Sequence, residues 1–237
     1  MKKKIGILGG ISLASTIQYY RAITDMYYQQ YHDYYYPEIL INSLDFQYFT
    51  DLENEGRTEE YIDYIVNGIR ALQNAGADFA ILAANSPHSV FPQVQAQVDL
   101  PMLSIVDETA GEVERLGLKT VLLTGIKYTM QSNFYPDGFR RRGIQVITPS
   151  EAHQDEINAI IFNELVIHRF SPATLRRFID IIHTYNVDGV ILGCTELPLL
   201  LQQADIDLPV LDTLALHARA ALDYSLAISA QAHPNGI

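Results

Sequence analysis

Cys194 is the side chain in this sequence best suited to acid–base or nucleophilic chemistry. It is the only cysteine in 237 residues, and it follows Gly193 and the short apolar run at 190–192. An apolar run ended by glycine is typical of a buried parallel strand. If a helix begins just beyond it, backbone N–H groups and a positive helix end would favour the thiolate. We therefore predict a reactive thiol at a strand end, rather than a small buried apolar residue.

Two other chemistries find little support. The chain has no G-x-S-x-G sequence, so a Ser-His-Asp hydrolase of the type built on that turn is not indicated. One cysteine and scattered histidines provide no metal-ligand spacing, so no metal site is predicted.

The stretch that holds Cys194 occurs twice. Residues 77–86 read ADFAILAANS and residues 187–196 read VDGVILGCTE, while DLPML at 99–103 matches DLPVL at 207–211. A unit repeated about 110 residues apart predicts two similar halves. In this register Ala84 occupies the place of Cys194, and a methyl group cannot exchange a proton.

Polar residues accompany both strand ends and the first glycine-rich turn. Asn85, Ser86 and Thr195 can bind a carboxylate and a developing enediolate oxygen, or they can act only as helix N-caps. Ser12 follows Gly-Gly in a turn that lacks the nucleotide patterns G-x-G-x-x-G and GK[ST]. A small anion such as a substrate carboxylate is the better ligand there.

Three further residues are predicted to support the site. His88 and His217 each lie near a predicted helix start, and either can instead be a hydrogen-bonded core residue. Glu196 follows Cys194 by two positions and can also serve only to favour a helix N-terminus.

The elements that must position these residues alternate between strand and helix, which predicts βαβ units and parallel sheets. Strands are expected at 4–8, 38–43, 79–83, 103–105, 120–123, 145–147, 189–192 and 210–211. Helices are expected from 15 or 16 to about 30 and at 58–75, 107–116, 134–142, 155–166, 172–185 and 215–227, with an acidic loop at 46–55. The expected fold is α/β, with two pseudo-symmetric Rossmann-like domains, 1–97 plus 209–237 and 98–208, and an active site in the cleft between them.

Composition excludes several classes of protein. A hydrophobic content of 48% with 19% charged residues fits a soluble globular chain. The net charge of −12 argues against a nucleic-acid partner. No apolar run reaches the roughly 20 residues of a membrane span. The opening MKKKIGILGG is interpreted as a strand rather than a signal peptide, so a cytoplasmic location is expected. Six tyrosines at 27–36 predict a helix face, a loop or a subunit contact.

Several segments together resemble the aspartate/glutamate racemase family over nearly the whole chain. They are GILGGIS at 6–12, ST at 15–16, YYR at 19–21, NSPH at 85–88, KYTM at 127–130, IN at 157–158, IIF at 160–162, EL at 164–165, GCTEL at 193–197, DT at 212–213 and HA at 217–218. The resemblance implies a two-domain α/β fold with neither pyridoxal phosphate nor metal. It implies removal and return of the α-proton of aspartate or glutamate by two cysteines that face each other across the substrate. It also makes Thr129 a substrate-binding residue. Together with the tyrosine-rich segment at 27–36, the resemblance implies a homodimer.

Two departures from the family pattern affect this prediction. Ala84 aligns with the first catalytic cysteine; some members carry threonine there and still racemise, and the sequence leaves open whether the alanine is natural or introduced. Where typical aspartate racemases place an arginine for the side-chain carboxylate, residues 43–47 read SLDFQ. Arg57 and Lys127 remain candidates for that contact on charge alone.

The sequence leaves two alternatives to a racemase impaired by Ala84. Arylmalonate decarboxylases resemble this family and keep only the second cysteine, which protonates a carbanion in an apolar pocket. The polar Asn85 and Ser86 favour the racemase. The other alternative is a binding protein for acidic amino acids that has no catalytic activity.

Overall fold

A computed structural model describes residues 2–227 and divides the chain into two compact units. Unit 1 contains the residues up to Ser104 and those from His217 onward, and unit 2 is Ile105–Leu216. The sequence-based boundaries at 97/98 and 208/209 therefore differ from this division by several residues. The difference arises because Met102 pairs with Ala80 of strand β3 in unit 1, and strand β7 pairs within unit 2.

Unit 1 is built on a three-stranded parallel sheet in the order β2-β1-β3. Its elements are β1 Ile5–Gly9, α1 Leu13–Tyr31, β2 Ile39–Ser43, α2 Phe46–Asn54, α3 Thr58–Asn74, β3 Phe79–Leu82, η1 Ser86–Val90 and α4 Phe91–Gln95. Successive strand residues point to opposite faces. Leu8 and Leu82 pack into the core formed with α2 and α3, while Phe79, on the alternate face, meets Tyr224 of the last helix at 4.8 Å between ring centres.

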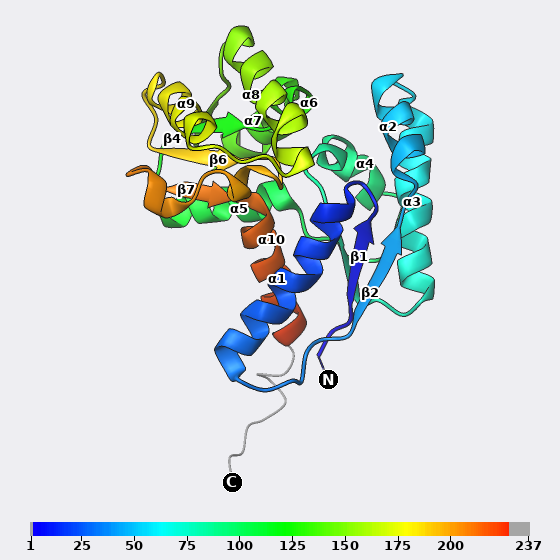
Figure 1. Ribbon diagram of the computed structural model, residues 1–237. Coiled ribbons are helices and arrows are strands. Elements are labelled where there is room, and N and C mark those ends of the chain that lie inside the picture. Colours follow the sequence, from blue (N-terminus) through cyan, green and yellow to red (C-terminus); the bar gives the residue numbers. More distant parts are fainter. Residues whose placement is uncertain (1, 228–237) are drawn as a thin grey trace. The chain divides into compact units, whose positions relative to one another are not determined.

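Unit 2 repeats this plan with a four-stranded parallel sheet in the order β5-β4-β6-β7. Its elements are α5 Ile105–Arg115, β4 Thr120–Thr124, α6 Lys127–Gln131, α7 Phe134–Arg140, β5 Gln145–Ile147, α8 Glu151–Asn163, η2 Leu165–Ile167, α9 Pro172–His183, β6 Gly189–Leu192, η3 Leu197–Leu199, η4 Gln203–Asp205 and β7 Val210–Asp212. Helices α8 and α9 cover one face of the sheet, and α5 and α7 cover the other (Figure 1). The last helix, α10 Thr213–Leu226, belongs to unit 1 from His217 onward. The predicted α/β fold with parallel sheets in two domains is confirmed.

The duplication seen in the sequence extends to individual hydrogen bonds. Ala80 pairs with Met102 just as Val190 pairs with Val210. In unit 1 the Gln95 amide accepts a hydrogen bond from Met102 N at 2.9 Å and donates to the carbonyls of residues 98 and 100. Gln203 makes the same three bonds to residues 206, 208 and 210. Each glutamine therefore holds the loop that leads to Met102 in unit 1 and to strand β7 in unit 2.

Several predicted elements are wrong in detail. Residues 46–55, expected as an acidic loop, are mostly helix α2, because Asp45 caps the helix and Phe49 and Leu52 are buried on one face. Residues 103–105 form no strand: only Met102 makes an isolated bridge, and α5 begins at Ile105. The helix expected at 155–166 begins at Glu151 and ends at Asn163. Among the described residues, no helix is long and apolar enough to cross a membrane.

The glutamine contacts yield a stability prediction. Gln95→Ala should lower the free energy of unfolding by about 1–3 kcal/mol, because it leaves the partly buried Met102 N–H and two carbonyls without their partner. Gln203→Ala should have an effect of similar size. Gln93→Ala, at an exposed position of the same helix, is the matched control. Urea unfolding checks this, and equal effects at positions 93 and 95 would contradict it.

Candidate functional site

The strand end of unit 1 is held by backbone hydrogen bonds on both sides of Ala84. Ala83 N donates to Leu8 O at 2.9 Å, and the Ser15 hydroxyl donates to Ala83 O at 2.5 Å. Ala84 itself is partly exposed, and its carbonyl accepts a hydrogen bond from Nδ1 of His88 at 3.0 Å. The methyl group of residue 84 is therefore placed by a rigid framework that carries no acid–base group at that position.

Ser12 belongs to the same region of unit 1. It is the N-cap of α1, and its Oγ accepts a hydrogen bond from Ser15 N, whose side chain contacts Ala83 O. Thr16 Oγ1 accepts from Gly10 N at 3.0 Å and donates to Ser12 O at 2.9 Å. The helix expected to begin at residue 15 or 16 therefore begins at Leu13, and the side chains of Ser15 and Thr16 hydrogen-bond to the backbone around this turn.

Asn85 and Ser86 follow Ala84 directly, and both are buried, with 5% and 7% of their surfaces exposed. The helix that begins there is the 3-10 turn η1, in which Asn85 makes no capping hydrogen bond from its side chain. The Ser86 side chain is hydrogen-bonded to the carboxyl of Glu53, which also accepts from Tyr61 OH at 2.9 Å. Burial raises the pKa of the Glu53 carboxyl, although these two hydrogen bonds oppose the rise.

Sequence reasoning missed Glu53 because residues 46–55 were interpreted as loop. The available signal was the apolar pair Phe49 and Leu52 at helical spacing, with Asp45 as an N-cap in front of them. A helix in this register places residue 53 at the edge of the buried face.

His88 and His217 lie in one column of rings within unit 1. The His88 ring stacks on Phe91 at 5.3 Å and meets His217 edge-on at 5.7 Å, and His217 in turn meets Tyr19. Both ring nitrogens of His217 are engaged, since Nε2 donates to Leu103 O and Nδ1 accepts from Tyr19 OH. Burial lowers the pKa of His217 to about 4 and holds the pKa of His88 well below its usual value. His217 is therefore a neutral, hydrogen-bonded core residue.

The strand end of unit 2 repeats the backbone arrangement with a different side chain. Gly193 N donates to Thr124 O at 2.8 Å, as Ala83 N does to Leu8 O. A Cβ at Gly193 would lie 2.7 Å from Thr124 O, which explains the glycine before Cys194. The chain then turns into the short 3-10 helix η3, so the α-helix end expected beside the thiol is absent.

Cys194 faces a carboxylate. Its Sγ–H donates to Glu196 Oε2 at 3.0 Å, and the Thr195 hydroxyl donates to the same oxygen at 2.9 Å. Burial is the main cause that raises the pKa of the Cys194 thiol well above its usual value. The negative charge of Glu196 and its hydrogen bond to the thiol raise this pKa further. The expectation of a thiolate favoured by a helix end is therefore wrong for this structure, which holds Cys194 as a protonated thiol beside a proton acceptor.

Thr129 lies directly beneath this turn. Its side chain is fully buried, and its methyl group lies 3.4 Å from the position that a Cβ on Gly193 would take. Thr129 Oγ1 makes no hydrogen bond within residues 2–227. A buried hydroxyl without a partner costs free energy unless a ligand or water meets it. This favours the predicted substrate contact of Thr129.

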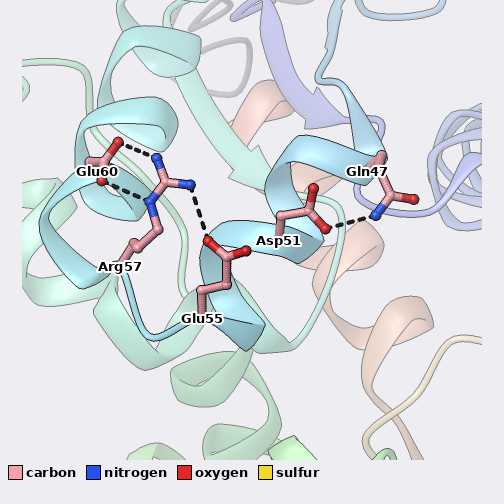
Figure 2. Close-up of polar contacts among 5 residues, drawn as sticks. All are labelled: Gln47, Asp51, Glu55, Arg57 and Glu60. Carbon is pink, nitrogen blue, oxygen red and sulfur yellow. Dashed lines mark hydrogen bonds and ion pairs between the residues drawn. The ribbon is translucent and has the colours of Figure 1, made fainter.

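The two cations considered for a substrate carboxylate are both paired with acidic side chains. Arg57 makes a two-pronged ion pair with Glu60 and also contacts Glu55 at 3.2 Å (Figure 2). Lys127 Nζ lies 2.5 Å from Asp155. Neither cation is available to a ligand without breaking these pairs. Within residues 2–227, no group of three or more His, Cys, Asp or Glu side chains is placed to hold a metal ion.

The structure thus gathers Ser12, Ala84, Asn85, Ser86 and His88 in unit 1. In unit 2 it gathers Thr129, Cys194, Thr195 and Glu196. Each group lies at the carboxyl ends of two neighbouring parallel strands, where open α/β sheets bind ligands.

The Cys194–Glu196 contact yields a test of the thiol. Glu196→Gln removes the negative charge beside Cys194, so the pKa of the thiol should fall and its pH profile of iodoacetamide alkylation should move to lower pH. The single cysteine makes the labelled site unambiguous. Glu164→Gln is the control, because that carboxylate of unit 2 contacts Thr174 instead. A profile that does not move, or moves to higher pH, would show that Glu196 does not control this thiol.

Comparison with known proteins gives one consistent result. The family model described as Asp/Glu/Hydantoin racemase matches residues 8–221. The broad specificity amino-acid racemase RacX of Bacillus subtilis is 27% identical over 232 residues, covering 94% of this chain and 98% of RacX.

Solved structures agree with this match. The crystal structure of an aspartate racemase homologue from Pyrococcus horikoshii is 36% identical, with a TM-score of 0.86, and covers 94% of this chain and 99% of its own. Aspartate racemase of Picrophilus torridus, at 24% identity and a TM-score of 0.74 over 94% of both chains, shares the fold. With the family match spanning most of its length, the chain belongs to the Asp/Glu/Hydantoin racemase family.

Proposed function

We propose that this chain exchanges the α-proton of an amino acid without a cofactor and is a slow racemase because Ala84 replaces the first thiol. Aspartate and glutamate are the substrates to test first, on the strength of the family and its aspartate racemase homologues. The observation that carries the proposal is the Cys194 thiol, hydrogen-bonded at 3.0 Å to Glu196 at the end of β6. The equivalent end of β3 carries only a methyl group.

Cys194 and Glu196 together can both remove and deliver a proton. When the thiol passes its proton to Glu196, the thiolate can take the α-proton, and the electron pair stays on the α-carbon as an enediolate. The raised pKa of Cys194 makes its thiolate a strong base once formed, and Glu196 provides the acceptor that its formation needs. In the reverse direction the thiol protonates the same face of the α-carbon.

The remaining predicted site residues are assigned to binding. Thr129, with its unpaired hydroxyl, can donate to the α-carboxylate and to the enediolate that replaces it. Thr195 can donate to them once its hydroxyl turns away from Glu196. Asn85, Ser86 and Ser12 provide polar groups at the unit 1 strand end. His88 holds the Ala84 carbonyl and His217 holds the Leu103 carbonyl, rather than touch the substrate.

Residue 84 provides the main test of this function. Ala84→Cys should raise the rate of racemisation by about 10²–10⁴-fold, because a positioned group then replaces water on one face. Exchange of the enantiomer whose α-hydrogen points to Cys194 should change little. Circular dichroism of L- and D-aspartate and of L- and D-glutamate, with α-proton exchange in D₂O, measures both.

Two controls decide how the result is interpreted. Cys194→Ala should abolish the exchange that the unchanged chain shows. Ala84→Val, which adds bulk without an acid–base group, should give no gain. Equal racemisation rates of the chain and its Ala84→Cys variant would show that residue 84 is not an acid–base position. The proposal that the two strand ends form equivalent catalytic positions would then be disproved.

We also propose that the chain forms a homodimer through its tyrosine-rich segment. Tyr34 and Tyr35 are 76% and 78% exposed, and Tyr28 of α1, which is 41% exposed, stacks on Tyr34 at 5.5 Å between ring centroids. Contiguous exposed aromatic surface of this kind is typical of a protein contact.

Light scattering should give about twice the monomer mass of 26.7 kDa at micromolar concentration. The double change Tyr34→Lys and Tyr35→Lys should shift this mass to that of the monomer, because two buried charges would face the partner. Ile167→Lys, at an exposed apolar position of unit 2, should leave the dimer intact. A monomeric chain without substitutions would disprove the dimer.

A further inference from the structure

We propose that Asn158 is a positioning residue of the candidate site, which holds the turn that carries Thr129 against the residues around Cys194. This inference rests on the proposed function and extends it to a residue of α8. Asn158 belongs to the sequence IN at 157–158, which resembles the family but has no role in the site described above. All the contacts that carry the inference lie within unit 2.

Helix α6 begins with a backbone N–H that its own N-cap cannot satisfy. The N-cap residue is Ile126, whose aliphatic side chain makes no capping hydrogen bond. The first N–H groups of a helix have no partner within the helix, so they need one from elsewhere. Asn158 provides it, because Lys127 N donates to Asn158 Oδ1 at 2.8 Å. A side chain of α8 therefore takes the part that a neighbouring Ser, Thr, Asp or Asn usually plays.

Such a contact matters most for a short helix. Helix α6 has five residues, and a helix of this length is not stable without contacts from the surrounding structure. Helices α6 and α8 lie side by side in unit 2 (Figure 1). Asn158 is partly buried, and its neighbour Ile157 is fully buried in the core, so packing fixes this part of α8. The hydrogen bond therefore ties a short helix to a firmly packed one.

The turn held in this way packs directly against the residues around Cys194. Thr129 is the third residue of α6, and its methyl carbon lies 3.4 Å from the position of a Cβ on Gly193. A Cβ on Gly125, just before α6, would lie 2.9 Å from Gly193 O. Met130, which follows Thr129, belongs to the same buried cluster as Cys194. A shift of α6 would therefore displace the unpaired Thr129 hydroxyl and loosen the packing around the thiol.

Lys127 has a second contact with α8, which serves for comparison. Its Nζ lies 2.5 Å from Asp155 Oδ1, and the two side chains are 35% and 59% exposed. An exposed ion pair adds little to stability, because water competes for both charges. The bond from Lys127 N to Asn158, by contrast, fixes the backbone at the start of the helix. The position of the turn therefore depends on Asn158 rather than on Asp155.

A purely structural role for Asn158 would stabilise unit 2 as a whole and would have no particular link to Thr129. The two roles differ in how substitutions combine. If Asn158 acts by placing the Thr129 hydroxyl, Asn158→Ala costs less once Thr129→Val has already removed that hydroxyl. If the two residues act independently, the slowing in the double variant is the product of the two single effects.

The experiment measures two rates for each variant. They are α-deuterium incorporation in D₂O for both enantiomers of aspartate and glutamate, and alkylation of Cys194 by iodoacetamide at one fixed pH. Asn158→Ala should slow the exchange by about tenfold or more, because a small misplacement of a binding group is costly. It should also speed alkylation several-fold, because the thiol is less tightly covered. Asn158→Asp, which keeps the Oδ1 acceptor, should restore most of both rates.

The matched control is Asp155→Asn, which removes the other contact between α8 and Lys127 and should change both rates less than about twofold. The double variant Asn158→Ala with Thr129→Val should be slowed by less than the product of the single effects. Urea unfolding identifies any variant that does not fold. Asn158→Ser, whose shorter side chain does not reach Lys127 N, replaces Asn158→Ala in that case.

Several results would overturn the proposal. They are equal effects of Asn158→Ala and Asn158→Asp, an equal effect of Asp155→Asn, a double variant slowed by the full product, and alkylation that Asn158→Ala leaves unchanged. If the chain without substitutions exchanges no enantiomer, the proposed function fails, and alkylation alone decides the role of Asn158. Faster alkylation in Asn158→Ala, but not in Asn158→Asp or Asp155→Asn, then supports the positioning of this turn, and any other pattern refutes it.

Discussion

The hydrogen bonds that close the central strand pairs, Ala83 N to Leu8 O and Gly193 N to Thr124 O, determine where the two key residues of this protein lie. Each bond comes from the residue immediately before position 84 or 194. Since parallel strands present their carboxyl ends at one edge, the side chains that follow β3 and β6 emerge at equivalent points of two similar sheets. The candidate chemistry depends on this placement.

The surroundings of the two strand ends are alike in one respect and opposite in another. At each end a side chain that carries a proton is hydrogen-bonded to a carboxylate: Cys194 to Glu196 in unit 2, and Ser86 to Glu53 in unit 1. Burial raises the pKa of Cys194 and of Glu53, because it disfavours the charged form of each group. The two ends differ in the group that donates the hydrogen bond, which is a thiol in unit 2 and a hydroxyl in unit 1. A thiol is much easier to deprotonate than a hydroxyl.

The histidines illustrate how tertiary contacts decide a role. His88 and His217 are residue types that commonly move protons, yet here they form a buried column with Phe91 and Tyr19. Their low pKa values follow from burial without a negative partner. Each of them holds a backbone carbonyl instead, His88 that of Ala84 and His217 that of Leu103.

The sequence by itself determined the parallel α/β fold, the duplication and the two strand ends at Ala84 and Cys194. These follow from local patterns, since apolar runs ended by Gly or Ala mark buried strands wherever they fold. It also located most polar residues of each site, because they are adjacent to those strand ends in the chain.

Only the tertiary structure decided what lies beside them. Glu53 precedes Ser86 by more than 30 residues in the chain, and no spacing rule predicts that their side chains meet. The direction of the Cys194 pKa likewise depends on burial and on the rotamer of Glu196, whereas sequence reasoning assumed a helix end that proved to be a short 3-10 turn. Arg57 and Lys127, plausible on charge, were excluded as free cations by acidic neighbours in space. The sequence specifies which titratable groups exist and which strand each one follows. The pKa of such a group depends on all the atoms packed around it, and most of these come from elsewhere in the chain.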